Sequence, residues 1–310
     1  MSYEGGMLEE LKMPSRKDVE EALLISLFKH QGVIKEFGSG EEIVDEIASY
    51  FTLSELQRNA FLETVYRKEN RVKKVSLWHR LLFRAAASLA NEDMVSRPTE
   101  TIHLTNRREW MLTEKGFDTA LMLMNIPEAK KDTLGIKSFE VQQVVKKITQ
   151  NQRPEHYNPF SEEKKTIKIE RELRLRARGF RQAVIEAYDY TCAVCGMKMY
   201  SPDFLSWEVE AAHIVPHSFM GKDDIWNGIA LCRLHHWAFD TGWFTLTNDL
   251  KTEVSPKIRL LPQGFGVLSN FDFIKALSEK NTPIILPERK EIYPHINAIN
   301  WHRENVFFQK

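Results

Sequence analysis

Two pairs of soft metal ligands stand close together in this sequence. Cys192 and Cys195 are separated by two residues, and Cys232 and His235 repeat that spacing about 40 positions later. The two pairs contain every cysteine of the chain. Three thiolates and one imidazole can close a tetrahedral zinc site, which leaves no position open for catalysis. We therefore predict a structural Zn²⁺ ion at this site, with three buried structural cysteines as the alternative.

A second set of polar residues lies between and after these pairs. His213 lies on a short predicted strand that ends before Pro216, and Asn227 can cap the segment that follows. His236 and Asp240 are four residues apart, so they share one face of a predicted helix. A strand histidine opposite a helical His/Asp pair would make a second metal centre, this time with open positions.

The ordered set His213, Asn227 and His236, flanked by the zinc-binding pairs, resembles the HNH endonucleases, whose ββα-metal unit grips one divalent ion. The resemblance implies that these three residues are catalytic, with His213 as the general base and Asn227 as the brace of the loop that carries it. It also implies that His236 and Asp240 hold Mg²⁺ or Mn²⁺. Phosphodiester hydrolysis needs such a base and such a cation.

One position departs from the HNH pattern. Many HNH enzymes have an aspartate or a second histidine just before the base histidine, where it binds the ion, but this chain has Ala212 there. The third ligand of the ion is therefore open. The nearby candidates, each of which is also an ordinary polar group of a loop or strand, are Glu210, His217, Asp223 and Asp224.

Further motifs narrow the resemblance to the HNH domain of bacterial restriction endonucleases. They lie at residues 180–188, 211–216, 239–242 and 301–307, and the similarity runs through residues 164–310. In that case the C-terminal tail belongs to the nuclease domain. His302 and Arg303 would then be either surface charges or supports of the site.

The N-terminal half must deliver the substrate to this centre. Its hydrophobic spacing predicts a series of short elements. They are helices over residues 15–30, from about 41, over 54–57 and over 76–90, then strands over 94–98, 101–104 and 109–113. Such a helical bundle followed by a basic β-hairpin forms a winged helix.

The same region resembles the N-terminal winged-helix domain of Mrr-type restriction enzymes. The resemblance covers residues 13–121 and rests on Met13–Arg16, Ser76–Ala85 and Leu112–Gly116. It implies DNA recognition by the arginine face of the helix over 76–90, with other basic residues near phosphates. The implied contacts are Lys73, Lys74, Arg80, Arg84, Arg97, Arg107 and Arg108. The alternative is a protein-interaction module with solvated surface charges.

Residues 122–163 are predicted to form a linker with one helix over 140–148. A basic run follows, with eight basic residues against two acidic ones between positions 164 and 181. Its cations are Lys164, Lys165, Lys168, Arg171, Arg174, Arg176, Arg178 and Arg181. Because the run precedes the metal segment, we expect Arg174 and Arg178 to contact DNA, with a solvated helix face as the alternative.

The length and composition allow two domains, but the net charge gives no indication of a binding partner. The chain has 310 residues, of which 43% are hydrophobic, and its 43 basic and 43 acidic residues cancel. No apolar run approaches the roughly 20 residues of a membrane span, and the first residues lack a signal-peptide pattern. We expect a cytoplasmic prokaryotic protein without membrane association. In such a reducing compartment clustered cysteines favour metal binding over disulfides.

These patterns together predict a multidomain α+β protein. A winged-helix domain over 1–121 and a linker over 122–163 precede a zinc-stapled ββα-metal (HNH) nuclease domain over 164–310. The predicted function is metal-dependent cleavage of double-stranded DNA in prokaryotic restriction or phage defence, with modified DNA as one candidate target. One such unit cuts one strand, so we expect a homodimer or two sequential nicks. The alternatives are a DNA-binding regulator with a degenerate HNH fold and a zinc-scaffold interaction protein.

Overall fold

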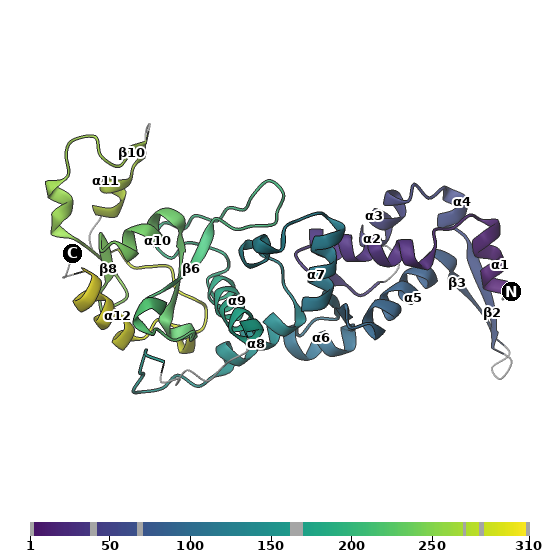
Figure 1. Cartoon of the computed structure of the whole chain (residues 1–310), viewed down its shortest axis with the longest axis horizontal. Coiled ribbons are helices and arrows are strands. Elements are labelled where there is room, and N and C mark those ends of the chain that lie inside the picture. The colour runs from purple at the N-terminus through teal and green to yellow at the C-terminus, as the bar shows by residue number, and fades with distance from the viewer. Residues whose placement is uncertain are drawn as a thin grey trace. The chain divides into compact units, whose positions relative to one another are not determined.

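The structure, a computed structural model, describes residues 3–37, 42–66, 71–161, 170–268, 271–278 and 282–307. The chain divides into two compact units, Met1–Gln142 and Gln143–Lys310 (Figure 1). Three lysines of the predicted basic run, Lys164, Lys165 and Lys168, lie outside the described residues.

The first unit combines short helices with two small antiparallel sheets. Its helices are α1 (Tyr3–Glu10), α2 (Arg16–Lys29), α3 (Glu42–Tyr50), α4 (Glu55–Arg58), α5 (Leu77–Asn91), α6 (Pro98–Thr105), α7 (Glu114–Leu123) and the 3-10 helix Glu128–Thr133. Its strands are β1 (Val33–Lys35), β2 (Phe61–Tyr66), β3 (Arg71–Ser76), β4 (Val95–Ser96) and β5 (Glu109–Leu112). Helix α8 (Phe139–Gln150) crosses the division between the units.

The predicted N-terminal helices are confirmed, and local capping explains where they begin. Ser15 caps α2 in a capping box with Asp18, and Ser76 caps α5 by accepting a hydrogen bond from the His79 backbone. The predicted apolar stripe of α5 is buried and packs against α2. Its members, all 4% exposed or less, are Leu77, Leu81, Leu82, Ala85 and Leu89.

The sheet of this unit has the strand order β1-β5-β4 and is antiparallel throughout. The predicted strand over residues 101–104 is wrong, because these residues lie in α6. Pro98 at the start of α6 has a backbone suited to the first helical turn, and the Glu100 carboxylate accepts a hydrogen bond from the Arg97 backbone at 2.7 Å. These local signals outweigh the β-branched residues that suggested a strand.

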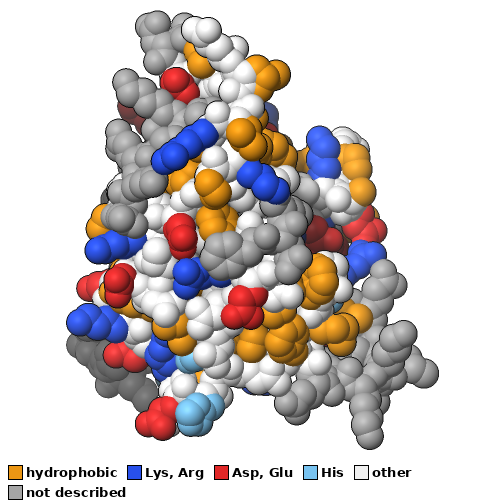
Figure 2. All heavy atoms as spheres, turned by 90° about the vertical axis from the view of Figure 1, so that its left-hand side faces the viewer, with side chains coloured by type: hydrophobic (Ala, Val, Ile, Leu, Met, Phe, Trp, Pro, Cys, Tyr) orange, Lys and Arg blue, Asp and Glu red, His pale blue; other side chains and the backbone are white. Residues whose placement is uncertain are grey.

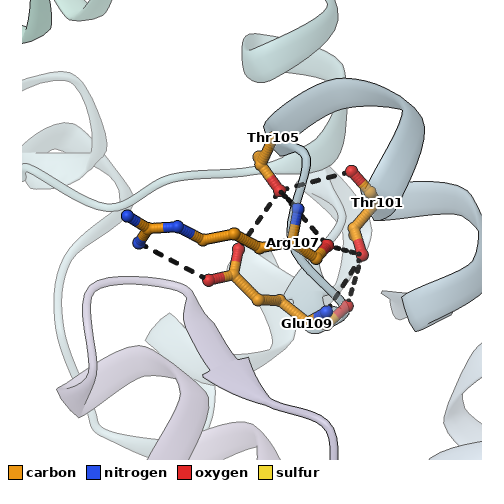
Figure 3. A network of polar contacts seen from close by, with 4 residues as sticks. All are labelled: Thr101, Thr105, Arg107 and Glu109. Carbon is orange, nitrogen blue, oxygen red and sulfur yellow. Dashed lines mark hydrogen bonds and ion pairs between the residues drawn. The ribbon is translucent and has the colours of Figure 1, made fainter.

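Helix α6 is fixed to the strand that follows it by a polar network (Figure 3). The Thr101 hydroxyl donates to the Glu109 carbonyl at 2.6 Å, and the Thr105 hydroxyl donates to the Glu109 carboxylate at 3.3 Å. The Arg107 side chain extends toward the same carboxylate, with its Nη1 4.0 Å from Glu109 Oε1. A second hairpin, β2–β3, stands before α5, and the sequence patterns did not predict it.

The described residues of the second unit form several helices beside α8 and three antiparallel strand pairs. The helices are α9 (Glu170–Ala187), α10 (Arg233–Asp240), α11 (Phe273–Ser278) and α12 (Ile296–His302), and a π-helical turn (Arg303–Phe307). The strands are β6 (Val209–His213), β7 (Gly228–Cys232), β8 (Phe244–Leu246), β9 (Thr252–Val254), β10 (Val267–Leu268) and β11 (Phe271–Asp272). Single 3-10 turns lie at His217–Phe219, Ile225–Asn227, Pro256–Leu260 and Lys290–Ile292.

The β6–β7 hairpin lies at the centre of this unit, and α9 and α10 both pack on its strands (Figure 1). The C-terminal segment packs against α10 through His302. Buried His302 stacks on Phe239 with ring centroids 3.7 Å apart, and its Nε2 donates to the Phe239 carbonyl at 3.1 Å. The sequence left His302 as either a surface charge or a support of the site. Its burial excludes a surface charge.

Surface charge is mixed. On the face drawn in Figure 2, basic, acidic and hydrophobic side chains of the described residues are interspersed, in keeping with the balanced charge of the sequence. Among the residues that the structure describes, no helix combines the length and the apolar character needed to cross a membrane.

The contact between α8 and α9 generates a stability prediction. A Cβ atom on Gly179 would lie 2.2 Å from Val144 Cγ1, whereas one on Gly6 in α1 would have no neighbour within 4 Å. We expect Gly179→Ala to lower the free energy of unfolding by about 1–3 kcal/mol through overpacking. Gly6→Ala, the control, should raise it by about 0.5–1 kcal/mol through helix propensity. Denaturant unfolding of both variants checks this, and equal shifts of the same sign would contradict it.

Candidate active site and metal cluster

The two cysteine-containing pairs come together as the sequence predicted. Cys192, Cys195, Cys232 and His235 each offer a ligand atom, and these atoms all lie within 4.8 Å of one another. The Cys195 and Cys232 sulfurs are 3.9 Å apart, and the Cys192 sulfur is 3.7 Å from His235 Nδ1. Such separations fit donors placed about 2.0–2.3 Å from one tetrahedral zinc ion. We call this group the Cys3His cluster; the identity of its ion stays a prediction.

Backbone contacts with the central hairpin hold the Cys3His cluster. The Ala193 amide donates to the Ala230 carbonyl of β7 at 2.8 Å, which fixes the first turn on the hairpin. Cys232 ends β7 and caps α10, so its sulfur and the His235 ring meet within one helical turn. Hydrogen bonds from the Cys195 and Cys232 thiols lower the pKa of Cys192. A thiolate, the form that binds zinc, is thereby favoured.

His213 ends strand β6 and lies against α9. Its ring stacks on Phe180 with centroids 4.0 Å apart and an interplanar angle of 19°. The approach of α9 depends on Gly228, the residue paired with His213 across the hairpin. A Cβ atom there would lie 2.3 Å from a Val184 methyl and 3.1 Å from the Phe180 ring. A glycine opposite the histidine therefore allows the aromatic ring to reach it.

A carboxylate holds one edge of the His213 ring. His213 Nε2 lies 2.9 Å from Asp223 Oδ1, and Arg176 Nε lies 3.5 Å from the other oxygen of Asp223. Burial alone would raise the pKa of Asp223, but the hydrogen bond with His213 and the charges of His213 and Arg176 lower it below its ordinary value. Asp223 is thus ionised at neutral pH.

Asn227 is fully buried and ties together the loop that follows His213. Its Oδ1 accepts from the Val215 amide at 2.8 Å, and its Nδ2 donates to the Val215 and Lys222 carbonyls, both at 3.0 Å. The Asn227 backbone carbonyl also accepts from the Ile214 amide at 2.9 Å. One side chain therefore joins both ends of this loop, and losing it would leave buried backbone groups unpaired.

His236 lies on α10 between two carboxylates. Its Nδ1 is 2.9 Å from Glu210 Oε2, and its Nε2 is 3.5 Å from Asp240 Oδ2. Arg233 Nε lies 3.2 Å from the other Glu210 oxygen. The hydrogen bond with His236 lowers the pKa of Glu210. Burial alone would lower the pKa of His236, but Glu210 and Asp240 together raise it.

The donor set on α10 suits a hard divalent ion. An imidazole nitrogen and a carboxylate oxygen 3.5 Å apart, on His236 and Asp240, can both face one cation. Ala212 is fully buried and offers no ligand. Among the described residues, three or more histidine, cysteine or acidic side chains lie close enough to share one ion only in the Cys3His cluster. His236 and Asp240 thus offer two donors on α10, and a divalent ion there stays a prediction.

Sequence reasoning missed the partners of both histidines. Glu210 and Asp223 stood only as candidate ligands, but the structure pairs them with His236 and His213. Arg176 belonged to a general basic run, yet it points to Asp223. Phe180 was noted only as part of a motif. No spacing rule links these residues, because loops of irregular length separate them.

The basic residues predicted to touch DNA have acidic or polar neighbours in the first unit. Arg80 and Arg84 of α5 both pair with the buried carboxylate of Glu4, at 2.9 and 2.8 Å. The others pair at the surface. Lys74 lies 3.2 Å from Glu63, Arg97 donates to Asn91 at 2.6 Å, Arg107 lies 4.0 Å from Glu109, and Arg108 donates to Glu36 at 3.0 Å. Lys73 lies in β3, and its side chain is outside the described set.

On α9 the two predicted DNA contacts differ. Arg174 is exposed, as a contact residue must be, whereas Arg178 is buried with 6% of its surface exposed. The expectation for Arg178 does not fit the structure, because a side chain enclosed by its own unit cannot reach a phosphate. Charge composition could not reveal which arginines of the run face inward.

Residues 192–247 match the family described as HNH endonuclease. The match spans both cysteine-containing pairs and every residue of the predicted centre, so an HNH endonuclease domain lies in this segment. One similar solved structure is described as "Modification dependent TagI restriction endonuclease". It is 24% identical with a TM-score of 0.28, over 41% of this chain and 37% of that one. A TM-score this low does not establish a shared overall fold. No curated protein matches the chain.

The neighbouring histidines of α10 generate a prediction about metal content. We expect His235→Gln to lose the zinc ion, of which the unaltered chain should hold about one, and to lower stability by several kcal/mol. His236→Gln, one residue further along the same helix, should retain the zinc ion because its side chain faces Glu210 and Asp240. Elemental analysis of the purified variants and their thermal unfolding measure both effects. Equal loss of zinc in the two variants would contradict the assignment.

Proposed function

We propose that the protein is a metal-dependent endonuclease that hydrolyses phosphodiester bonds of double-stranded DNA. The observation that carries this proposal is the pairing of His213 with an ionised Asp223, beside the loop braced by Asn227 and within a segment that matches HNH endonucleases. A histidine oriented by a carboxylate is suited to accept a proton at neutral pH.

The proposed reaction assigns one task to each residue. His213 accepts a proton from a water molecule as one O–H bond breaks. The water oxygen forms the new bond to phosphorus, and the bond to the leaving oxygen breaks with its electron pair, after which solvent protonates that oxygen. Asn227 keeps the loop after His213 in place, and His236 with Asp240 would hold Mg²⁺ or Mn²⁺. A bound divalent cation would neutralise charge on the phosphate and the leaving oxygen.

For the first unit we propose DNA recognition by a winged-helix arrangement. The strand order β1-β5-β4, with α5 before β4, supports this proposal, although α6 replaces the expected hairpin segment. Lys74, Arg107 and Arg108 each have an exposed side chain paired with one carboxylate. An ion pair at the surface is worth about 0–1 kcal/mol and can exchange for a phosphate contact. Of these cations, Arg107 has a side chain 78% exposed, so we include it in the contact surface.

The biological role and assembly that we propose rest on the resemblance to restriction enzymes. A single HNH centre cuts one strand, so we propose either a homodimer or two successive nicks, which the ratio of nicked to linear plasmid distinguishes. Cleavage of phage DNAs that carry different base modifications tests the proposed role in defence.

The nuclease proposal predicts the effect of removing the base. With Mg²⁺ or Mn²⁺, we expect the unaltered protein to cut plasmid DNA and His213→Ala to cut it about 10²–10⁴-fold more slowly, because the general base is lost. Chelation of the ion should stop cleavage of both. His156→Ala is the control, since His156 lies in an exposed loop of the same unit.

A different outcome would favour the second candidate function. The absence of an acid at Ala212 makes a DNA-binding regulator with a degenerate HNH fold the alternative. Salt-sensitive DNA binding without metal-dependent cleavage of any modified or unmodified DNA would support the regulator and refute the endonuclease.

The DNA-recognition proposal predicts a change in salt dependence. We expect Arg107→Glu to weaken binding of a DNA duplex and to reduce the slope of log K against log[salt] by about 1, because one phosphate contact is lost. Arg16→Glu is the matched control, because Arg16 is also exposed and ion-paired but lies on α2. Fluorescence anisotropy at several KCl concentrations measures both. Equal weakening by the two variants would exclude a specific role for Arg107.

A further inference from the structure

Each of the two predicted histidines of the site belongs to an arginine–carboxylate–histidine chain. In the first, Arg176 Nε lies 3.5 Å from Asp223 Oδ2, and Asp223 Oδ1 lies 2.9 Å from His213 Nε2. The remaining ring nitrogen, Nδ1, has no hydrogen-bond partner among the residues that the structure describes. His213 is still 23% exposed at its side chain, so a water molecule can reach the ring.

The second chain also joins an arginine, a carboxylate and a histidine, but here the carboxylate contacts Nδ1 of the ring and not Nε2. Arg233 Nε lies 3.2 Å from Glu210 Oε1, and Glu210 Oε2 lies 2.9 Å from His236 Nδ1. Here the other ring nitrogen, Nε2, faces Asp240 at 3.5 Å. One histidine is therefore held at Nε2 and the other at Nδ1.

We propose that Asp223 and Glu210 are positioning residues that fix opposite tautomers of the two histidines. Asp223 keeps the proton of His213 on Nε2, which leaves Nδ1 as the atom that accepts the proton from water. Glu210 keeps the proton of His236 on Nδ1, which leaves the Nε2 lone pair for the divalent ion. The inference rests on the proposed endonuclease function and adds residues that supply neither the base nor a metal ligand.

The first assignment follows from the limits of a carboxylate. An ionised carboxylate can only accept hydrogen bonds, so the ring nitrogen beside Asp223 must carry the hydrogen. The Phe180 ring, stacked on His213 at 4.0 Å, confines the imidazole to one plane. The Arg176 contact holds the second oxygen of Asp223, so the carboxylate cannot turn away easily. These contacts together fix the orientation of Nδ1, the ring nitrogen of His213 that accepts the proton.

The second assignment explains how the site functions without an acid at position 212. Alternate residues of a strand face the same side, so Glu210 points to the side of Ala212. Both oxygens of Glu210 are already engaged, by His236 Nδ1 and Arg233. Glu210 is therefore the carboxylate that orients a metal-binding histidine, an arrangement that commonly accompanies such ligands. Its role is to aim Nε2 at the ion beside Asp240.

Imidazole tautomers can be measured directly without any enzymatic assay. In the protein labelled with ¹⁵N-histidine, with zinc kept in the Cys3His cluster and no other divalent ion added, the ring ¹⁵N shifts report which nitrogen carries hydrogen. The measurement is made at about pH 9, where an ordinary histidine of pKa about 6.5 is neutral. Loss of signals in His213→Ala and His236→Gln assigns the two residues. We expect an Nε2–H tautomer for His213 and an Nδ1–H tautomer for His236.

Amide substitutions should reverse the tautomers. In Asp223→Asn the amide oxygen can accept from Arg176, so the amide NH₂ faces His213 and moves its hydrogen to Nδ1. In Glu210→Gln the same exchange beside Arg233 moves the hydrogen of His236 to Nε2. The matched controls are Asp224→Asn and Glu208→Gln, because Asp224 accepts from the Tyr157 hydroxyl and Glu208 from the Arg233 backbone. Both controls should leave the two tautomers unchanged.

The two substitutions should also have different effects on the cleavage rate and on the affinity for Mn²⁺. Asp223→Asn should lower single-turnover cleavage about 10²–10⁴-fold while Mn²⁺ affinity, measured by electron paramagnetic resonance, stays unchanged. Glu210→Gln should weaken Mn²⁺ binding about 10–100-fold, and excess Mn²⁺ should restore much of its cleavage rate. Circular dichroism of each variant establishes that the fold is retained.

Specific results would overturn the proposal. An Nδ1–H tautomer of His213 in the unaltered protein, or variants whose tautomers and Mn²⁺ affinity match those of the controls, would refute it. If the unaltered protein cuts no DNA, the proposed endonuclease function fails, but the ¹⁵N shifts and Mn²⁺ binding still decide whether Asp223 and Glu210 set the tautomers. The two failures are thus distinguishable.

Discussion

The register of the β6–β7 hairpin is the constraint on which both the Cys3His cluster and the surroundings of His213 depend. It pairs Val209 with Cys232 at one end and His213 with Gly228 at the other. The first pair sets the start of α10 and with it the Cys3His cluster, whereas the second lets Phe180 approach the base candidate. A one-residue slip would turn every side chain of a strand to the opposite face. Both would then be lost together.

Helix α10 separates two adjacent histidines by geometry. Successive residues of a helix are about 100° apart around its axis, so neighbouring side chains face different surroundings. His235 is buried, 3.0 Å from the Cys232 sulfur, while His236 faces Glu210 and Asp240. The soft donors on one side suit zinc, and the hard oxygen donors on the other suit Mg²⁺ or Mn²⁺. The Cys3His cluster lies at the start of α10 and therefore constrains the helix that carries His236 and Asp240.

Much of the local structure was predictable because its causes are local. Hydrophobic spacing located α2, α3 and α5, and the two-residue spacing of cysteine and histidine located the Cys3His cluster. The strand expected over residues 101–104 failed because the capping at Pro98 and Glu100 has more influence there than β-branched residues. Each of these signals lies within a single segment of the chain, and only the completion of the Cys3His cluster required two segments to meet.

The partners of the catalytic candidates were not predictable in the same way. Asp223 meets His213 through a loop whose path is set by the hydrogen bonds of Asn227, and Arg176 reaches the pair from a separate helix. Likewise, Arg178 is buried because α9 presents that side to its own unit. Such pairings depend on tertiary packing, so residue type and spacing could identify candidates without assigning their roles.

The balanced charge of the chain also bears on how it would hold DNA. Arg80 and Arg84 share one buried carboxylate, Glu4, so a phosphate would have to replace a partner that is already shielded from water. Exposed pairs such as Lys74 with Glu63 are weaker and more strongly screened by salt. A neutral protein with paired cations should therefore bind DNA weakly at random positions, because nonspecific affinity comes mainly from unpaired positive charge. Specific contacts that displace the acidic partners would then supply most of the selectivity.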